Sequence, residues 1–357
     1  MTVETADLRP GHRISRIIKG GWQLAGDHGE VLPEQAIADM EAFLDAGITT
    51  FDCADIYRGV EEMIGAFIGD VRRRRGKDVA DRVVVHTKLV PDLGRLADIR
   101  PDEIEAIVDR SLARLRIERL PLVQFYWWDM STGDPLAALS VLKDCQRKGK
   151  IATLGVTNWD FPTMERFAGA GYDIASAQVQ YSLLDRRPAG DFSRWCAARN
   201  VQILCYGTLA GGFLTRHWLG RPDPGFSFEN RSLIKYRLII DEFGSWELFQ
   251  ALLETLQAVG DRHGVSLASV ATRWVLDQPQ VGAAIVGARY ARHLPQTLEA
   301  FGLALDAADR AAIAAVLAQA RGPAGPVYGL ESDRSGRHGR IMKYNLNANP
   351  NDKVLGA

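Results

Sequence analysis

The sequence predicts an α/β protein built as a parallel (β/α)8 barrel (a TIM barrel), with long loops on its C-terminal face and an extended C-terminal tail. Three observations predict it. Strand and helix patterns alternate through most of the 357 residues, a usual length for one barrel. The expected strand in 49–57 (TTFDCADIY) turns from apolar to ionisable side chains, and so does the one in 83–88 (VVVHTK). A parallel barrel carries its catalytic groups at such strand ends.

The expected strands are short runs of β-branched and apolar residues. In order they are 14–19, 48–51, 83–85, 122–127, 151–156, 174–179, 201–205 and 283–286. Between them, apolar stripes with helical spacing lie at 33–45, 61–71, 102–115, 135–146, 161–167 and around Trp195. The pattern predicts eight strand–helix units in a single domain that covers 1–357, with a core of about 14–320.

Two segments interrupt this alternation. Residues 207–243 are too long for an ordinary connection and carry Trp218, Phe226, Phe228 and Tyr236 among Pro and Gly, so we expect an ordered flap. Residues 322–357 form a tail rich in Gly, Arg and Asn, without an apolar period. We expect neither segment to be a separate domain.

The composition excludes several classes of function. Hydrophobic residues make up 46% of the chain, and the net charge of −1 favours neither nucleic acid nor an anionic membrane as a partner. The N-terminus lacks the apolar run of a signal peptide, and no stretch approaches the length that spans a bilayer. We therefore expect a cytoplasmic protein that binds neither nucleic acid nor membrane.

The cysteines argue against a metal site. Cys53, Cys145, Cys196 and Cys205 show no ligand spacing, and reduced thiols fit the expected compartment. Cys53 follows Asp52, but strand alternation turns it to the opposite face, which favours a core thiol over a nucleophile.

Asp52, Tyr57 and Lys88 stand at the ends of neighbouring expected strands and form a proton-donor set. Tyr57 is the candidate acid, and because its ordinary pKa of about 10 is high for that task, a cation such as Lys88 would have to lower it. Asp52 would hold and neutralise Lys88. A structural interpretation stays open, in which Asp52 and Lys88 are a buried ion pair and Tyr57 only packs.

FDCADIY followed by HTKL resembles the aldo-keto reductase signature. LVQFYWWD, LGVTN, AQVQYSLL, CYGTLAGGFLT and IVGAR agree with that family in order and spacing, from about Ile17 to about Gly302. The resemblance implies a barrel that binds NADP(H) and transfers a hydride between the nicotinamide and a small-molecule carbonyl or alcohol substrate. It also implies that Asp52, Tyr57 and Lys88 are catalytic, with Tyr126 in the fourth position.

By the same resemblance, residues at the strand ends would bind the cofactor. Thr157, Asn158 and Gln178 would hydrogen-bond the nicotinamide carboxamide, a group that needs a donor and an acceptor. Gly21, Trp22 and Asp52 would border the same site.

Tyr206 would stack on the nicotinamide ring, and Gly207, Leu209 and Gly211 would offer backbone N–H groups to the pyrophosphate. Taken alone, Tyr206 would be an ordinary core aromatic. The glycine-containing turn and the flap that follow it favour the cofactor role.

After the last expected strand come Gly287, Arg289, Arg292, His293 and Gln296, at a place where barrels commonly bind phosphate. An arginine can meet a ribose 2′-phosphate with two parallel hydrogen bonds, which favours NADP over NAD. Solvated surface arginines are the alternative.

The fourth strand departs from the family pattern, which normally has a His where this chain has Tyr126. A phenol also donates a hydrogen bond, but it is longer than an imidazole and is never cationic near neutral pH. The departure keeps the reductase hypothesis and leaves the acceptor open. The alternatives are an NADP(H)-binding regulatory protein with weak or no turnover, and a reductase of an activated double bond.

Aromatic residues are expected to line the substrate pocket: Trp22, Tyr57, Tyr126 and Trp127, with Trp128 and Trp218 as further candidates. The tail carries the basic residues Arg334, Arg337, His338, Arg340 and Lys343. Folded over the active face, such groups could recognise a carboxylate or phosphate on the substrate. A solvated or subunit-bridging tail is the alternative, and an oligomer is possible.

Overall fold

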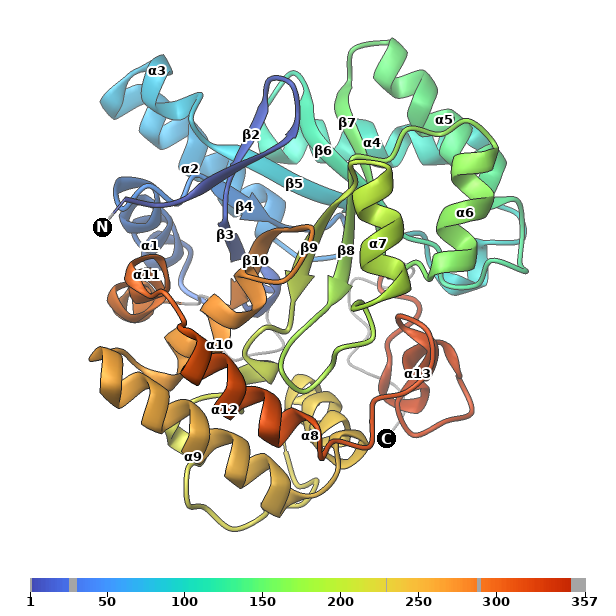
Figure 1. The fold of residues 1–357 in the computed structure, drawn as a ribbon. Coiled ribbons are helices and arrows are strands. Elements are labelled where there is room, and N and C mark those ends of the chain that lie inside the picture. Colours follow the sequence, from blue (N-terminus) through green and yellow to red (C-terminus); the bar gives the residue numbers. More distant parts are fainter. Residues whose placement is uncertain (1, 26–30, 229, 288–289, 348–357) are drawn as a thin grey trace.

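The computed structural model describes residues 2–25, 31–228, 230–287 and 290–347. A closed parallel barrel forms its centre, in the strand order β10-β3-β4-β5-β6-β7-β8-β9. The barrel strands are β3 (Ile17–Gly20), β4 (Thr50–Asp52), β5 (Val84–Leu89), β6 (Leu120–Phe125), β7 (Ile151–Thr157), β8 (Ser176–Gln180), β9 (Gln202–Tyr206) and β10 (Val281–Gly287). Helices surround them, which confirms the predicted (β/α)8 architecture (Figure 1).

The helices are α1 (Pro33–Asp45), α2 (Val60–Arg75), α3 (Lys77–Ala80), α4 (Pro101–Leu115), α5 (Pro135–Arg147), α6 (Phe161–Gly169), α7 (Asp191–Ala198), α8 (Arg231–Phe243), α9 (Trp246–His263), α10 (Leu267–Leu276), α11 (Leu294–Gly302), α12 (Ala307–Leu317) and α13 (Gly329–Ser332). The helices α1, α2, α4, α5, α6 and α7 lie at the expected stripes, whereas α3 and α8 to α13 were not among them. Their starts follow local chemistry. In α5, for example, Pro135 takes the first position and the Asp134 carboxylate accepts a hydrogen bond from Ala137 N at 2.9 Å.

An antiparallel hairpin of β1 (Thr5–Arg9) and β2 (His12–Ser15) precedes the barrel. Leu8 and Ile14 of the hairpin share a buried cluster with interior residues of the barrel, so the hairpin closes one end. The single strand expected at 14–19 is therefore wrong. Residues 12–15 pair with β1, whereas 17–20 pair with β4 and β10, so the chain changes partners at Arg16.

The flap and the tail both carry ordered structure at the barrel end opposite the hairpin (Figure 1). Helix α8 belongs to the flap, and its Ile239, Ile240 and Phe243 pack with α9, α10 and α12 in a second buried cluster. The tail contains α13 and a short 3₁₀ turn at Gly339–Ile341. These two segments place side chains over the C-terminal ends of the barrel strands.

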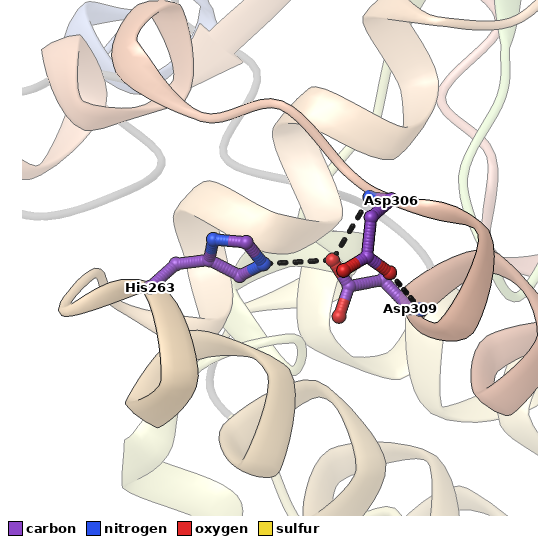
Figure 2. Close-up of side chains that lie close together, drawn as sticks. All are labelled: His263, Asp306 and Asp309. Atoms are coloured by element: carbon purple, nitrogen blue, oxygen red, sulfur yellow. Dashed lines mark hydrogen bonds and ion pairs between the residues drawn. The ribbon is translucent and has the colours of Figure 1, made fainter.

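One group of His and carboxylate side chains joins α9 to α12 outside the barrel (Figure 2). His263 Nε2 lies 2.7 Å from Asp309 Oδ2, and Arg262 pairs with the other oxygen of Asp309. Asp306 and Asp309 also form a reciprocal capping box at the start of α12, with hydrogen bonds of 2.8 and 3.0 Å. Because both oxygens of Asp309 and one oxygen of Asp306 are engaged in these contacts, we assign the group to helix anchoring.

Candidate active site

A cavity of about 650 Å³ opens at the C-terminal ends of the barrel strands, between the flap and the tail. Its walls include most of the residues that the sequence predicts for catalysis and cofactor binding: Trp22, Asp52, Tyr57, Lys88, Tyr126, Thr157, Asn158, Gln178, Tyr206, Gly207, Leu209, Gly211, Gly287, His293 and Gln296. Residues distant in sequence meet here because parallel strands end at one rim.

Asp52 and Lys88 form a buried ion pair at the base of this cavity. Lys88 Nζ lies 2.6 Å from Asp52 Oδ2 and 2.8 Å from the carbonyl oxygen of Cys53, and both side chains are 5% exposed. Asp52 Oδ1 accepts further hydrogen bonds from Gln178 Nε2 at 2.7 Å and Gln124 Nε2 at 3.2 Å. Burial works to lower the pKa of Lys88, but the charge of Asp52 and the nearby Tyr57 outweigh it, so the pKa is raised and the ammonium persists.

Tyr57 lies in the turn after β4, with Lys88 Nζ 5.1 Å from the centre of its ring. Trp22 contacts the ring edge-on, with 5.0 Å between ring centres. Burial raises the pKa of Tyr57, and Lys88 offsets only part of that rise. The expectation that Lys88 would bring this pKa below its ordinary value is therefore wrong in this cavity, although Lys88 acts in the expected direction. Tyr57 is accordingly a protonated phenol, the form that donates a proton.

The residues expected at the nicotinamide carboxamide lie together. Asn158 adopts a left-handed backbone (φ 59°), and its side-chain oxygen accepts a hydrogen bond from Tyr206 Oη at 2.9 Å. Gln178 Nε2 donates to Asp52 Oδ1 and to Gln124 Oε1, the latter at 3.1 Å. An amide nitrogen has two hydrogens, so both are used, and Gln178 presents its carbonyl oxygen as an acceptor.

The turn after β9 is shaped by close contact with α8. Gly207 and Gly211 have φ values of 68° and 64°, and a Cβ at either position would come within 2.6 Å of the Tyr236 ring or its oxygen. Only glycine fits this turn. Lys235, the neighbour of Tyr236, holds its Nζ 4.8 Å from the ring centre of Tyr206.

The loop after β10 is described in part, because Arg289 lies outside the described residues. His293 and Gln296 border the cavity, whereas Arg292 does not and instead donates from Nε to His293 Nε2 at 3.1 Å. Gly21, which the sequence predicts at the cofactor, does not border the cavity, whereas its neighbour Gly20 does. Gly21 N donates to the carbonyl oxygen of Asp52 at 2.7 Å, and a Cβ at Gly21 would meet the same oxygen at 2.7 Å.

Two aromatic residues expected at the pocket lie elsewhere. Trp127 is buried in the core, stacked on Phe125, with its Nε1 donating to the Thr132 carbonyl oxygen at 2.9 Å. Trp128 borders the cavity in its place. Trp218 packs in an aromatic cluster that includes Phe213. Neighbouring tryptophans in a turn point in different directions, and their order in the sequence does not say which one faces the cavity.

The tail crosses the cavity, but most of its basic residues pair with acids of the barrel and flap. Arg334 lies 3.1 Å from Asp129, Arg337 lies 3.2 Å from Asp241, and His338 lies 3.2 Å from Glu242. With these three contacts, basic residues of the tail hold it against the barrel and the flap.

Sequence reasoning did not find several cavity residues of the flap and tail: Ser232, Lys235, Tyr328, Ile341, Met342 and Leu346. Of the basic tail residues that it named, Lys343 borders the cavity. Tyr328 Oη accepts a hydrogen bond from Tyr126 Oη at 3.0 Å, across 202 residues of sequence. In the sequence, Tyr328 is marked only by its place before Gly329 in a tail without an apolar period.

Within the described part of the chain, no helix combines the length and apolar character that crossing a membrane requires. The profile of the Aldo/keto reductase family matches residues 16–318. Aldo-keto reductase YhdN of Bacillus subtilis is 28% identical over 329 residues, which cover 89% of this chain and 95% of that protein. An NADP(+)-designated aldo-keto reductase, yakc, of Schizosaccharomyces pombe is 33% identical over 178 residues, 48% of this chain and 51% of that protein.

Solved structures show the same fold. The glycerol dehydrogenase of Gluconobacter oxydans superposes with a TM-score of 0.74 and 26% identity, covering 91% of this chain and 98% of that one. An aldo-keto reductase of Klebsiella pneumoniae in complex with NADPH superposes with a TM-score of 0.68 and 23% identity, covering 91% and 99%. The family profile spans most of the barrel and both partners of the Asp52–Lys88 pair. The chain therefore belongs to the aldo/keto reductase family of oxidoreductases, which act on carbonyl and alcohol groups.

Proposed function

We propose that this protein transfers a hydride between NADP(H) and a small carbonyl or alcohol substrate, with Tyr57 as the acid and base. The observation that carries the proposal is the arrangement of Asp52, Lys88 and Tyr57 in one cavity. The buried ammonium of Lys88 is neutralised by Asp52 and lies beside the protonated phenol of Tyr57. This arrangement at the rim of a barrel is suited to proton donation.

The cavity fits a dinucleotide cofactor. Thr157 and Thr208 border it, and their hydroxyl oxygens are buried without a hydrogen-bond partner among the described residues. Buried hydroxyls of this kind are normally satisfied, so they favour a polar ligand. Gln178 would receive the carboxamide N–H on its carbonyl oxygen, and the Gly207–Gly211 turn would let backbone approach the pyrophosphate closely.

NADP is preferred over NAD for two reasons. Among relatives and structural neighbours, the yeast protein is designated for NADP(+) and the Klebsiella structure contains NADPH. In this chain, Arg292 and His293 form the 3₁₀ turn after β10, where a barrel would receive a ribose 2′-phosphate.

The chain's own chemistry follows from the geometry. The bound cofactor would supply or accept the hydride. Tyr57 Oη–H donates its proton to the carbonyl oxygen as charge develops there. Lys88 stabilises the phenolate that remains, and Asp52 keeps Lys88 in place. In alcohol oxidation the same phenolate receives the proton.

The test is turnover by the native protein and by Tyr57→Phe. NADPH consumption would be followed with aldehydes, ketones and conjugated enones, and NADPH binding by fluorescence titration. We expect native turnover of carbonyls, none in Tyr57→Phe, and the same NADPH affinity in both, because only the phenolic oxygen is lost. Tyr181→Phe, which alters a buried tyrosine outside the cavity wall, is the matched control.

Two results would contradict the proposal. NADPH binding without turnover of any acceptor would identify a regulatory binding protein. Consumption with enones alone, with reduction of the double bond, would identify a different acceptor class.

A further inference from the structure

We propose that Tyr328 of the tail is the hydrogen-bond donor that holds the reacting oxygen of the substrate, and that Tyr126 acts behind it as a positioning residue. The inference rests on the proposed carbonyl chemistry at Tyr57. It assigns to the C-terminal segment a role that the family pattern places on the fourth strand.

The two phenols meet inside the cavity. Tyr126 Oη donates to Tyr328 Oη at 3.0 Å, and the rings stand perpendicular with 6.1 Å between their centres. Both residues border the same cavity as Tyr57 and Lys88. Tyr126 directly follows β6, and Tyr328 directly precedes α13. One phenolic oxygen therefore comes from the barrel and the other from the tail.

The direction of this hydrogen bond decides which phenol is free to act. Tyr126 gives its hydrogen to Tyr328, which keeps its own O–H. No acceptor for the O–H of Tyr328 lies among the residues that the structure describes. Burial raises the pKa of both phenols, so each keeps its proton at neutral pH. A donor that is itself an acceptor is polarised by its partner and becomes the stronger donor.

The position of Tyr328 is fixed by its surroundings. Its backbone is left-handed (φ 60°), a conformation that residues other than glycine rarely adopt unless neighbouring contacts impose it. Three residues later, Glu331 forms hydrogen bonds of 2.9 and 3.0 Å to Arg187, which is itself paired with Asp185 at 2.6 Å. Gln180 at the end of β8 completes the network with a hydrogen bond of 2.7 Å to Asp185.

This network ties the tail to the barrel wall and holds the Tyr328 oxygen at a set distance from Tyr126. The site that holds the reacting oxygen of the substrate (the oxygen site) needs such a fixed donor. A donor that must reorganise during the reaction stabilises the transition state less. The replacement of His by Tyr126 is therefore matched by a second phenol, and the two together form the oxygen site.

The experiment compares Tyr328→Phe with Tyr126→Phe, the double variant and the native protein, all as full-length chains. Tyr328→Phe should lower kcat by about 100-fold, as expected for one oxyanion donor, with unchanged NADPH affinity. Tyr126→Phe should have the smaller effect. The double variant should be no slower than Tyr328→Phe, because Tyr126 acts through Tyr328.

Tyr344→Phe is the matched control. It removes a tail phenol that donates to the Gly339 carbonyl oxygen at 2.8 Å and does not border the cavity. Trypsin cleavage at the exposed Arg334 and Arg337 reports whether the tail stays docked. We expect native activity in Tyr344→Phe and native cleavage rates in Tyr328→Phe.

Three outcomes would overturn the inference while leaving the proposed function intact: native kcat in Tyr328→Phe, additive losses in the double variant, or equal losses in Tyr344→Phe with faster cleavage. Each requires that the native protein turns over and that Tyr57→Phe does not. Absence of native turnover would overturn the proposed function, and this inference with it.

Discussion

Arg187 and Glu331 form a bidentate ion pair of 2.9 and 3.0 Å, with side chains only 2% and 0% exposed, that joins the barrel to the tail across 144 residues of sequence. Asp185 holds Arg187 from the other side at 2.6 and 2.9 Å. A buried charge of this kind is costly to leave without its partner. The pair therefore sets where the tail lies over the cavity, including Tyr328.

Glu331→Gln should destabilise the protein. Breaking a buried pair costs about 3–5 kcal/mol, and we expect the lower end because Asp185 still neutralises Arg187. The measurement is the free energy of unfolding in urea. Arg334→Ala is the control, since it removes an exposed pair with Asp129 and should cost less than about 1 kcal/mol. An equal loss of unfolding free energy in the two variants would show that the buried Arg187–Glu331 pair stabilises the protein no more than an exposed pair does.

Tyr126→His should restore or broaden turnover of simple aldehydes. It recreates the donor of the family pattern and removes the longer phenol from the oxygen site. Tyr126→Phe should cost less than about 2.7 kcal/mol of transition-state stabilisation, which is the 100-fold loss expected for Tyr328→Phe, and less than Tyr57→Phe. The measurement is kcat/KM with an aldehyde series. If Tyr126→Phe abolished turnover and Tyr57→Phe had only a small effect, the proton donor would be Tyr126, which follows β6. The roles assigned to the two tyrosines would then be reversed.

The unmodified protein should bind NADPH more tightly than NADH. Arg292→Ala should reduce the difference, because the guanidinium can pair with the 2′-phosphate that NADH lacks. Arg289→Ala extends the test to the position outside the described residues. Fluorescence titration with both cofactors gives the affinities, and Arg340→Ala, in the tail, is the control. Equal affinity of the native protein for NADPH and NADH would remove the preference for NADP.

Stability should fall on acidification because of a histidine pair at the closed end of the barrel. His12 Nε2 lies 3.2 Å from His86 Nε2, and burial lowers the pKa of His12 from 6.5 to about 4 and that of His86 well below its usual value. Below about pH 6.5 the unfolded chain takes up these protons and the folded chain does not. The free energy of unfolding should therefore fall by about 1.4 kcal/mol per pH unit per histidine down to about pH 4.

His12→Gln removes one titrating group and can still hydrogen-bond Thr153, which His12 contacts at 2.9 Å. Its unfolding free energy should depend less steeply on pH between 6.5 and 4 than that of the native protein. His217→Gln, at an exposed position, is the matched control for loss of an imidazole. An unchanged slope in His12→Gln would show that His12 does not carry the acid sensitivity.

Sequence reasoning reached far in the barrel because strand and helix periods are local. Asp52 is the last residue of β4 and Lys88 the last but one of β5, both after apolar residues, and parallel strands must bring those ends to one rim. It failed where a segment changes partners. Residues 14–19 read as one β-favouring run, yet their hydrogen bonds divide between the hairpin and the barrel.

The sequence by itself determined the eight-stranded barrel and the Asp52, Tyr57 and Lys88 set, since apolar periodicity and residue type at strand ends are properties of short stretches. Tertiary structure alone decided that Trp128 and not Trp127 faces the cavity, and that burial outweighs Lys88 at Tyr57. It also brought Tyr328 to Tyr126. The physical reason is that side-chain direction in turns, desolvation and contacts across 202 residues arise only when distant segments pack together.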